Sequence, residues 1–214
     1  HDGQNVTKGL VEIPVTMHVY PPCPKPVDLT VDNITQTSAV LNWTAIGNET
    51  TWNLKYGAPG FDPETEGTLV GGITKPYLLE GLNHSSDYAF RVQAVCDDNE
   101  LSDWSKEKVF STLCGANELP FVEDFEGVGF PPKCWNIYDL DGGGTQWVVS
   151  SAQNHTPGGS KSAYHQWASG DQDGWLVTPQ IQLPEDLDIN LSFWSFNLYP
   201  GDYGENSVLI STGS

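Results

Sequence analysis

The chain has few basic residues and no long apolar run, and both absences restrict what it can be. Its 214 residues contain nine Lys and Arg against 28 Asp and Glu, which gives a formal net charge of −19. Nucleic acid is bound through clustered basic residues, and this chain has a single arginine, Arg91, so nucleic acid is excluded as a partner. No apolar stretch approaches the length of a signal core or a membrane span, so no transmembrane segment is predicted here.

Helical periodicity is lacking as well. No window repeats apolar residues at helical spacing, and the longest apolar stretches are a few residues bounded by Gly, Pro, Asn or Asp. The chain does contain 22 glycines, 15 prolines and eight each of Trp, Tyr and Phe. This composition is typical of short strands separated by turns. We therefore predict an all-β protein, long enough for one to two domains that each bury a core.

Recognisable catalytic motifs are also missing. The sequence has no H-E-x-x-H and no G-x-S-x-G, and its five histidines accompany no nucleophile in a matching motif. Carboxylates are numerous, so a glycosidase-like pair of carboxylates stays open as an alternative. We predict that this chain is not an enzyme.

The excess of carboxylates has two interpretations. Acidic side chains can form a solvated surface that keeps a secreted protein soluble. Several of them can instead form sites for a hard cation, which suits Ca²⁺ because this ion prefers many oxygen ligands.

A leucine six residues before a tyrosine marks the middle of the chain. Leu82 precedes Tyr88, which opens a strand of alternating apolar residues. This spacing is typical of the tyrosine corner of a β-sandwich, in which the hydroxyl bonds back to the chain just upstream. With Trp43 on an earlier alternating strand, the stretch from about Cys23 to Leu113 resembles a fibronectin type III domain. The resemblance implies an immunoglobulin-like β-sandwich over residues 22–113, with these three side chains in its core and corner.

Seven strands are expected in this sandwich. They lie near Val27–Asn33, Ser38–Thr44, Thr51–Gly57, Gly67–Val70, Tyr77–Leu82, Tyr88–Cys96 and Lys106–Thr112.

A series of short motifs follows in residues 114–214. In order, they are Asp124-Phe125-Glu126, Pro131-Pro132, Cys134-Trp135, the turn from Asp139 to Gly144, Trp147, the run from Asp173 to Pro179, and Leu191 to Trp194. This order resembles the cleaved adhesin or choice-of-anchor J domains of secreted Bacteroidetes proteins and, more loosely, the animal MAM domain. The resemblance implies a jelly-roll β-sandwich that serves adhesion.

Both ends of the chain suggest neighbouring domains. Residues 1–21 alternate like one strand before a proline cluster, and we interpret them as the terminal strand of a preceding immunoglobulin-like domain plus a linker. Packing of this strand against the next module is the alternative. The resembled jelly rolls are longer than residues 114–214, so we expect the N-terminal part of such a fold here, ending near a strand at Ser207–Ser211. The chain is thus expected to be continuous with further domains on both sides.

The four cysteines allow three pairings. None forms a C-x-x-C and no histidine lies at metal-ligand spacing, which argues against zinc. Each cysteine sits near a module edge, so we favour the disulfides Cys23–Cys96 and Cys114–Cys134 and an oxidising compartment. Reduced, buried thiols are the alternative.

The resemblance to jelly rolls that bind structural calcium nominates four ligands. Along an expected strand Val122–Glu126, Asp124 and Glu126 share one face. Asp139 and Asp141 lie on a glycine-rich loop that can fold its carbonyls toward a cation. In the alternative interpretation, the loop pair caps a turn and the other two are solvated.

Aromatic residues in the last module could stack on the C–H face of a sugar ring. The candidates are Trp147, His165, Trp167, Trp175, Tyr199 and Tyr203. Buried aromatics at strand spacing are usually core, and we expect this of Trp175, Phe193 and Trp194. Tyr199 and Tyr203 lie in a Pro-Gly-Asp loop, which makes them the preferred ligand-binding candidates.

These patterns together predict a secreted or cell-surface region that binds an extracellular carbohydrate or protein and holds structural calcium. One alternative is an ancillary spacer or targeting region of a secreted peptidase or glycoside hydrolase. Another is the ectodomain of a eukaryotic adhesion receptor built from MAM and fibronectin modules. The second would use glycan acceptors, and seven Asn-x-Ser/Thr triplets are present, at Asn5, Asn33, Asn42, Asn48, Asn83, Asn154 and Asn190.

Overall fold

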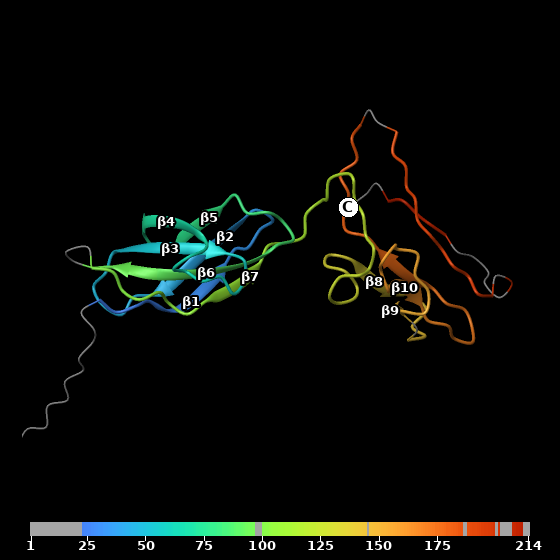
Figure 1. Ribbon diagram of the computed structural model, residues 1–214, viewed down its shortest axis with the longest axis horizontal. Helices are drawn as coiled ribbons and strands as arrows, with labels where there is room; N and C mark the ends of the chain where they lie inside the picture. The colour runs from blue at the N-terminus through green and yellow to red at the C-terminus, as the bar shows by residue number, and fades with distance from the viewer. Residues whose placement is uncertain are drawn as a thin grey trace, which may run out of the picture. The chain divides into compact units, whose positions relative to one another are not determined.

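A computed structural model describes residues 23–96, 100–144, 146–185, 188–199, 201 and 207–211. The chain divides between Thr112 and Leu113 into two compact units, and the regular secondary structure of the described residues consists of β-strands (Figure 1). The all-β prediction is confirmed. The strand expected within residues 1–21 lies outside the described residues. The part of the chain that the structure describes holds no helix long and apolar enough to cross a membrane.

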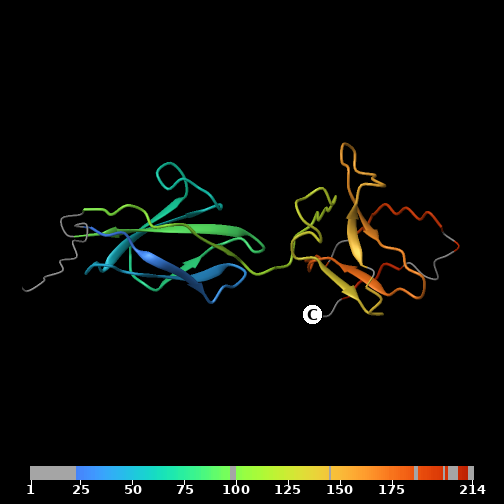
Figure 2. The same ribbon diagram turned by 90° about the horizontal axis from the view of Figure 1, so that it is seen from below.

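The first unit is a sandwich of two antiparallel sheets, drawn as separate layers in Figure 2. One sheet has the order β1-β2-β5 and the other β4-β3-β6-β7. The strands are β1 (Val27–Asp32), β2 (Ser38–Thr44), β3 (Thr51–Gly57), β4 (Thr68–Ile73), β5 (Tyr77–Glu80), β6 (Asp87–Val95) and β7 (Lys108–Ser111). All seven predicted strands are present, within a few residues at their ends.

Strand β4 departs most from its expected bounds. Gly71-Gly72 suggests a strand end, but the pairing with β3 continues to Ile73 across a register shift between Trp52 and Leu54. Gly72 has a φ of 69° there, a left-handed conformation that favours glycine. The glycines therefore form a bulge within the strand.

Alternation along the central strands builds the core. In β6, Phe90, Val92 and Ala94 are fully buried while the residues between them are not. Across the core, the rings of Trp43 and Trp52 meet edge to face with centroids 5.4 Å apart. Burial of each large apolar side chain of this kind contributes about 1.5–3 kcal/mol. The prediction that Trp43 is a core residue is confirmed.

The tyrosine corner is formed as the spacing predicts. The hydroxyl of Tyr88 accepts a hydrogen bond from the backbone N–H of Asn83 at 2.9 Å. Leu82 is buried beside it, and the Tyr88 ring stacks on Phe110 of β7 with centroids 5.9 Å apart. The corner thus fixes the chain where it enters β6.

Two serines complete the edge of β6 beyond its pairing with β7. The ladder with β7 covers Asp87–Phe90. Further along, Val92 N–H donates to Ser105 Oγ and Ala94 N–H donates to Ser102 Oγ, both at 2.9 Å. Both serines are buried. Their hydroxyls therefore take the place of strand carbonyls, a role that the sequence pattern did not reveal.

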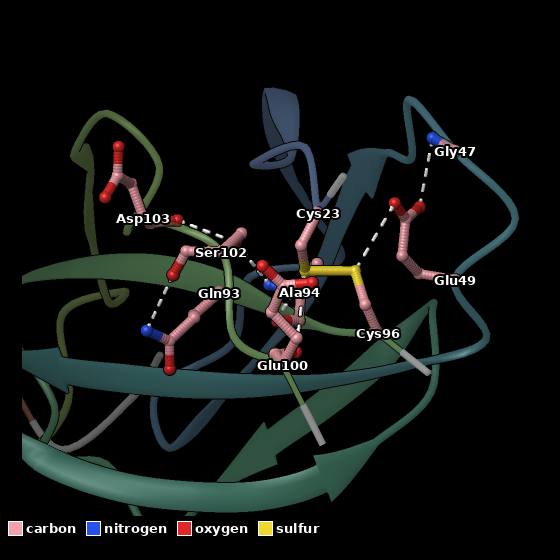
Figure 3. Close-up of a disulfide and its surroundings, with 9 residues drawn as sticks. All are labelled: Cys23, Gly47, Glu49, Gln93, Ala94, Cys96, Glu100, Ser102 and Asp103. Carbon is pink, nitrogen blue, oxygen red and sulfur yellow. Dashed lines mark hydrogen bonds between the residues drawn. A yellow bond between two sulfur atoms is a disulfide. The ribbon is translucent and has the colours of Figure 1, made fainter. Parts of the chain in front are cut away.

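Both predicted disulfides, Cys23–Cys96 and Cys114–Cys134, are confirmed. The first joins the chain just before β1 to the residue that follows β6 (Figure 3). Its sulfurs contact oxygens of neighbouring residues, with Cys23 Sγ 3.5 Å from the Glu100 carbonyl. Since disulfide sulfurs carry no hydrogen, these are packing contacts rather than donated hydrogen bonds.

The second unit has two short hairpin-like sheets. Strand β8 (Asn136–Asp139) pairs with β11 (Gly174–Val177), and β9 (Trp147–Ser150) pairs with β10 (Ser162–His165), all antiparallel. A parallel bridge also joins Asn117 to Ile181. The large buried apolar side chains of the described residues all belong to the first unit.

Two expectations for this unit are wrong. Residues 188–199 and 207–211 form no strand, so the strand expected at Ser207–Ser211 is absent. Phe193 and Trp194, expected in the core, are 61% and 77% exposed, and Trp175 is 37% exposed. For Phe193 and Trp194 the physical reason is that no paired strand holds residues 188–199 against a second layer, whereas Trp175 lies on the two-stranded sheet of β8 and β11, which is too small to cover it.

Candidate functional site

The segment before Glu126 is a turn, so the expected strand Val122–Glu126 is wrong. Glu123 Oε1 accepts the N–H of Phe125 at 2.7 Å, and Asp124 Oδ1 accepts the N–H of Glu126 at 3.0 Å. Phe125 has a φ of 61°. Local carboxylate-to-backbone bonds of this kind offer the backbone an alternative to a sheet ladder. Asp124 is therefore engaged within its own turn.

Glu126 connects this turn to a distant segment. Its Oε1 accepts the backbone N–H groups of Ser160 at 2.6 Å and Lys161 at 2.7 Å, and Ser160 Oγ donates to its Oε2 at 3.2 Å. Lys161 Nζ donates in return to the carbonyls of Glu126 at 3.0 Å and Gly127 at 3.1 Å. The N–H of Lys161 is the main cause that lowers the pKa of the Glu126 carboxyl below its ordinary value of 4.5.

Asp139 shapes the glycine-rich loop after β8. Its Oδ1 accepts the N–H of Gly142 at 3.0 Å and its Oδ2 accepts the N–H of Gly144 at 2.9 Å. Both glycines have a φ above 70°, which a side chain would strain. Asp139 thus caps a turn, as one of the two interpretations of this residue predicts.

Asp141 ties the same loop to the start of β11. Its Oδ1 accepts the N–H of Gly143 at 2.6 Å, and its Oδ2 accepts the N–H of Asp173. The N–H of Asp173 is the main cause that lowers the pKa of the Asp141 carboxyl below its ordinary value of 3.8. Asp173 Oδ1 in turn accepts the indole N–H of Trp175 at 2.6 Å.

The four predicted calcium ligands therefore form two separate pairs, each within its own hydrogen-bonded turn or loop. Asp124 and Glu126 belong to the turn that meets residues 160–161, whereas Asp139 and Asp141 belong to the loop that meets Asp173. Among the described residues, no three His, Cys, Asp or Glu side chains gather in a group that could hold a metal ion. Calcium binding stays a prediction.

Of the two preferred aromatic candidates, Tyr199 is 60% exposed and Tyr203 lies outside the described residues. Trp147 and His165 instead contact each other edge to face at 5.4 Å, and the Trp147 indole N–H donates to the Gly174 carbonyl at 3.0 Å. This pair holds β9 and β10 together. Trp167 is exposed.

Sequence reasoning missed a stacked pair. The ring of His155 lies parallel to the indole of Trp194, with centroids 3.6 Å apart and an angle of 12° between the planes. Asn154 places His155 on a turn, because its Oδ1 accepts the N–H of Thr156 at 2.8 Å. The sequence Asn-x-Thr indicates the turn. Nothing in the sequence near Trp194 indicates that its ring contacts His155, which lies 39 residues earlier.

Exposed aromatic rings gather along one stretch of the chain. We define residues 193–199 as the aromatic segment. More than half of the surface of each of its aromatic residues is exposed, namely of Phe193, Trp194, Phe196 and Tyr199. Exposed apolar groups of this extent mark interaction sites more often than single surface residues do.

The sandwich with its corner and disulfide, followed by a turn-rich β unit, defines a two-module protein of extracellular class. Residues 24–110 match the family model of the fibronectin type III domain, and residues 119–214 match that of the Cleaved Adhesin Domain. The chain therefore contains a fibronectin type III domain followed by a cleaved adhesin domain, as the sequence motifs predicted. These domains indicate an extracellular, adhesion-type region.

Known proteins similar to this chain match it over about half of its length. The human receptor-type tyrosine-protein phosphatase F is 37% identical over 92 residues, which are 41% of this chain and 5% of that protein. A solution structure of the third fibronectin III domain of human KIAA0343 protein is 19% identical and covers 53% of this chain and 100% of its own, with a TM-score of 0.37. The fibronectin type-III domain of human fibronectin type III domain containing protein 3 is 16% identical and covers 46% and 93%, with a TM-score of 0.34.

Proposed function

We propose that this chain is a non-catalytic, extracellular ligand-binding region of a secreted or cell-surface protein. The ligand is a carbohydrate or a protein, and the aromatic segment of the second unit contacts it. The match of this unit to a cleaved adhesin domain supports an adhesive role. Both matched domains are of kinds without catalytic activity.

One observation carries the proposal, namely the exposed ring of Trp194 held flat against His155. A ring fixed on one side loses little conformational freedom when a ligand covers its other side. Trp and Tyr are also the side chains that most often dominate binding energy at interfaces. Tyr199 on the same segment extends the aromatic surface that we assign to the ligand, and Tyr203, outside the described residues, stays a candidate from the sequence.

Structural calcium belongs to the same proposal. Asp139 and Asp141 share one glycine-rich loop, where both carboxylates already accept backbone N–H groups, so an ion there would use the lone pairs that these bonds leave. Since fewer than three acidic side chains of the described residues meet, a bound Ca²⁺ would take most of its ligands from backbone carbonyls and water. Calcium should then raise the unfolding temperature of the second unit, and a chelator should lower it. Identical unfolding curves in both conditions would remove calcium from the proposal.

A receptor ectodomain is a second candidate function. The observation that favours it is the 37% identity to the human receptor phosphatase over 92 residues. Glycan mass at the Asn-x-Ser/Thr triplets of the natively expressed protein would support this candidate. Unmodified asparagines throughout would count against it.

Binding of the full chain to an array of glycans and matrix proteins tests the main proposal. The Trp194→Ala and Tyr199→Ala variants should lose most of the signal on any bound member. Leu78→Ala is the matched control, because it removes a half-exposed apolar side chain of the first unit. Absence of binding to every member would favour a spacer role, such as an ancillary region of a secreted peptidase or glycoside hydrolase.

A further inference from the structure

A groove of about 320 Å³ lies on the first unit where β1 and β7 approach each other. Lys25 lies just before β1, Lys106 lies just before β7, and Lys108 is the first residue of β7. The volume is at the lower end of ordinary small-molecule sites, roughly 300–1,000 Å³. The groove belongs entirely to the fibronectin type III domain and is separate from the aromatic segment.

The groove is positive on a strongly negative protein. It holds three of the nine basic residues of the chain, whose net charge is −19. Two carboxylates, Asp28 and Glu107, also line it. Glu107 is already engaged, because it pairs with Arg91 at 3.2 Å and accepts the N–H of Gly60 at 3.1 Å. With that pair neutral, three lysines against Asp28 leave a local charge of +2.

These three lysines differ from the other described lysines of the first unit. Lys55 Nζ donates to the Pro63 carbonyl at 2.6 Å, and Lys75 Nζ donates to the Trp43 carbonyl at 2.9 Å, so both have structural roles. The three groove lysines are exposed. Within the described residues, the ion pair that forms is Arg91–Glu107, so the groove ammonium groups form no ion pair with a carboxylate there.

The floor of the groove is apolar. Pro26 is fully buried, and Val27 and Leu29 are half-buried beside it. The β1–β2 register shifts between Val27 and Thr30, and Asp28 has a φ of 50° at this irregularity. The bulge therefore places an acidic residue at the groove in a conformation that non-glycine residues seldom adopt.

We propose that this groove binds an acidic saccharide of one or two rings. The C–H face of a pyranose would lie on the accessible parts of Val27 and Leu29, and its carboxylate or sulfate group would meet the lysine ammonium groups. Sugar hydroxyls would donate to Asp28, whose carboxylate can only accept. An acidic peptide would bring further carboxylates toward Asp28 and offer it only backbone N–H groups, and a long polyanion would meet the repulsion of the whole molecule.

Calorimetric titration of the full chain tests this site. The probes are a glucuronate-containing disaccharide, a sulfated disaccharide, a neutral disaccharide and a tetraglutamate peptide. We expect one or both acidic disaccharides to bind more tightly than the neutral one, and the stronger of the two identifies the acidic group. Binding should weaken when the salt concentration rises.

Variants make the assignment specific. Lys106→Gln should weaken the bound acidic disaccharide about threefold, and the triple change of Lys25, Lys106 and Lys108 to Gln about 25-fold, as exposed ion pairs contribute up to about 1 kcal/mol each. Lys133→Gln removes the same charge from the second unit and should leave the affinity unchanged. Equal binding of neutral and acidic sugars, equal binding of tetraglutamate, or full affinity in the triple variant would each overturn the site. Trp194→Ala should leave this affinity intact, so failure here and failure of the aromatic segment are distinguishable.

Discussion

Lys161 and Glu126 form reciprocal hydrogen bonds, in which the side chain of each residue contacts the backbone of the other. The Lys161 N–H donates to Glu126 Oε1 at 2.7 Å, and Lys161 Nζ donates to the Glu126 carbonyl at 3.0 Å. The second unit has no buried cluster of large apolar side chains among its described residues. Reciprocal polar contacts between distant segments therefore add to its short sheets, to the Cys114–Cys134 disulfide and to the ring contacts of Phe125 in holding this unit together.

The Glu126→Ala variant should lower the unfolding temperature of the second unit. It removes the acceptor for two backbone N–H groups and for the Ser160 hydroxyl. Thermal unfolding followed by NMR signals of residues 126–165 reports on this unit alone. Glu185→Ala is the control, because it removes an exposed carboxylate of the same unit. An unchanged transition in both variants would show that the contact is not needed for folding.

Acid should weaken the second unit before the first. The pKa values of Glu126 and Asp141 are lowered from 4.5 and 3.8 by backbone N–H donors. A carboxyl whose folded pKa is lowered stabilises the fold fully above its unfolded pKa and loses that contribution as the pH falls through its folded pKa. Unfolding measured from pH 6 to pH 2 should show this loss below about pH 4.5. The Glu126→Gln variant should have a shallower slope, and an equal slope would contradict the assignment.

Tyr88→Phe should destabilise the first unit by about 1 kcal/mol, because it removes one hydrogen bond and keeps the ring. The lost partner is the Asn83 N–H at 2.9 Å, whereas the stacking on Phe110 remains. Urea unfolding followed by NMR signals of the first unit measures the change. Tyr77→Phe removes a hydroxyl from another partly buried ring of the same core and should change stability by less.

Ser105→Ala should lower the free energy of unfolding of the first unit by about 1–3 kcal/mol. The change removes one oxygen atom, but it leaves the N–H of Val92 buried without a partner. The same urea unfolding experiment applies. Ser111→Ala is matched in chemistry but exposed, and it should stay within about 0.5 kcal/mol of the parent. Equal small effects of both changes would mean that water reaches the Val92 N–H.

The first unit could be predicted from the sequence because its signals are local and periodic. Alternation in Ser38–Thr44 and Asp87–Val95 gives both the strands and their buried faces, and the Leu82 and Tyr88 spacing gives the corner. Burial of one face of a strand fixes its register, since a shift of one residue would turn the apolar side chains toward solvent.

The second unit was less predictable because its contacts are long-range and polar. The carboxylates of Glu123 and Asp124 bond to the backbone two residues ahead, which converts an apparent strand into a turn. Glu126 finds its partners at Ser160 and Lys161, and His155 finds Trp194. No periodicity connects these positions, so a sequence pattern nominates the residues without pairing them.

The Cys23–Cys96 disulfide gives the first unit a mechanical property. Tension that enters at Cys23 passes through the sulfur bridge to Cys96, past a loop whose ends are 73 positions apart and which includes β1 to β6. At about 3.5 Å per extended residue, roughly 250 Å of chain is kept from being drawn out. Only β7 and the short stretch around it carry the load toward the second unit. A connection built this way yields by a short step, because most of its extended length stays locked behind the disulfide.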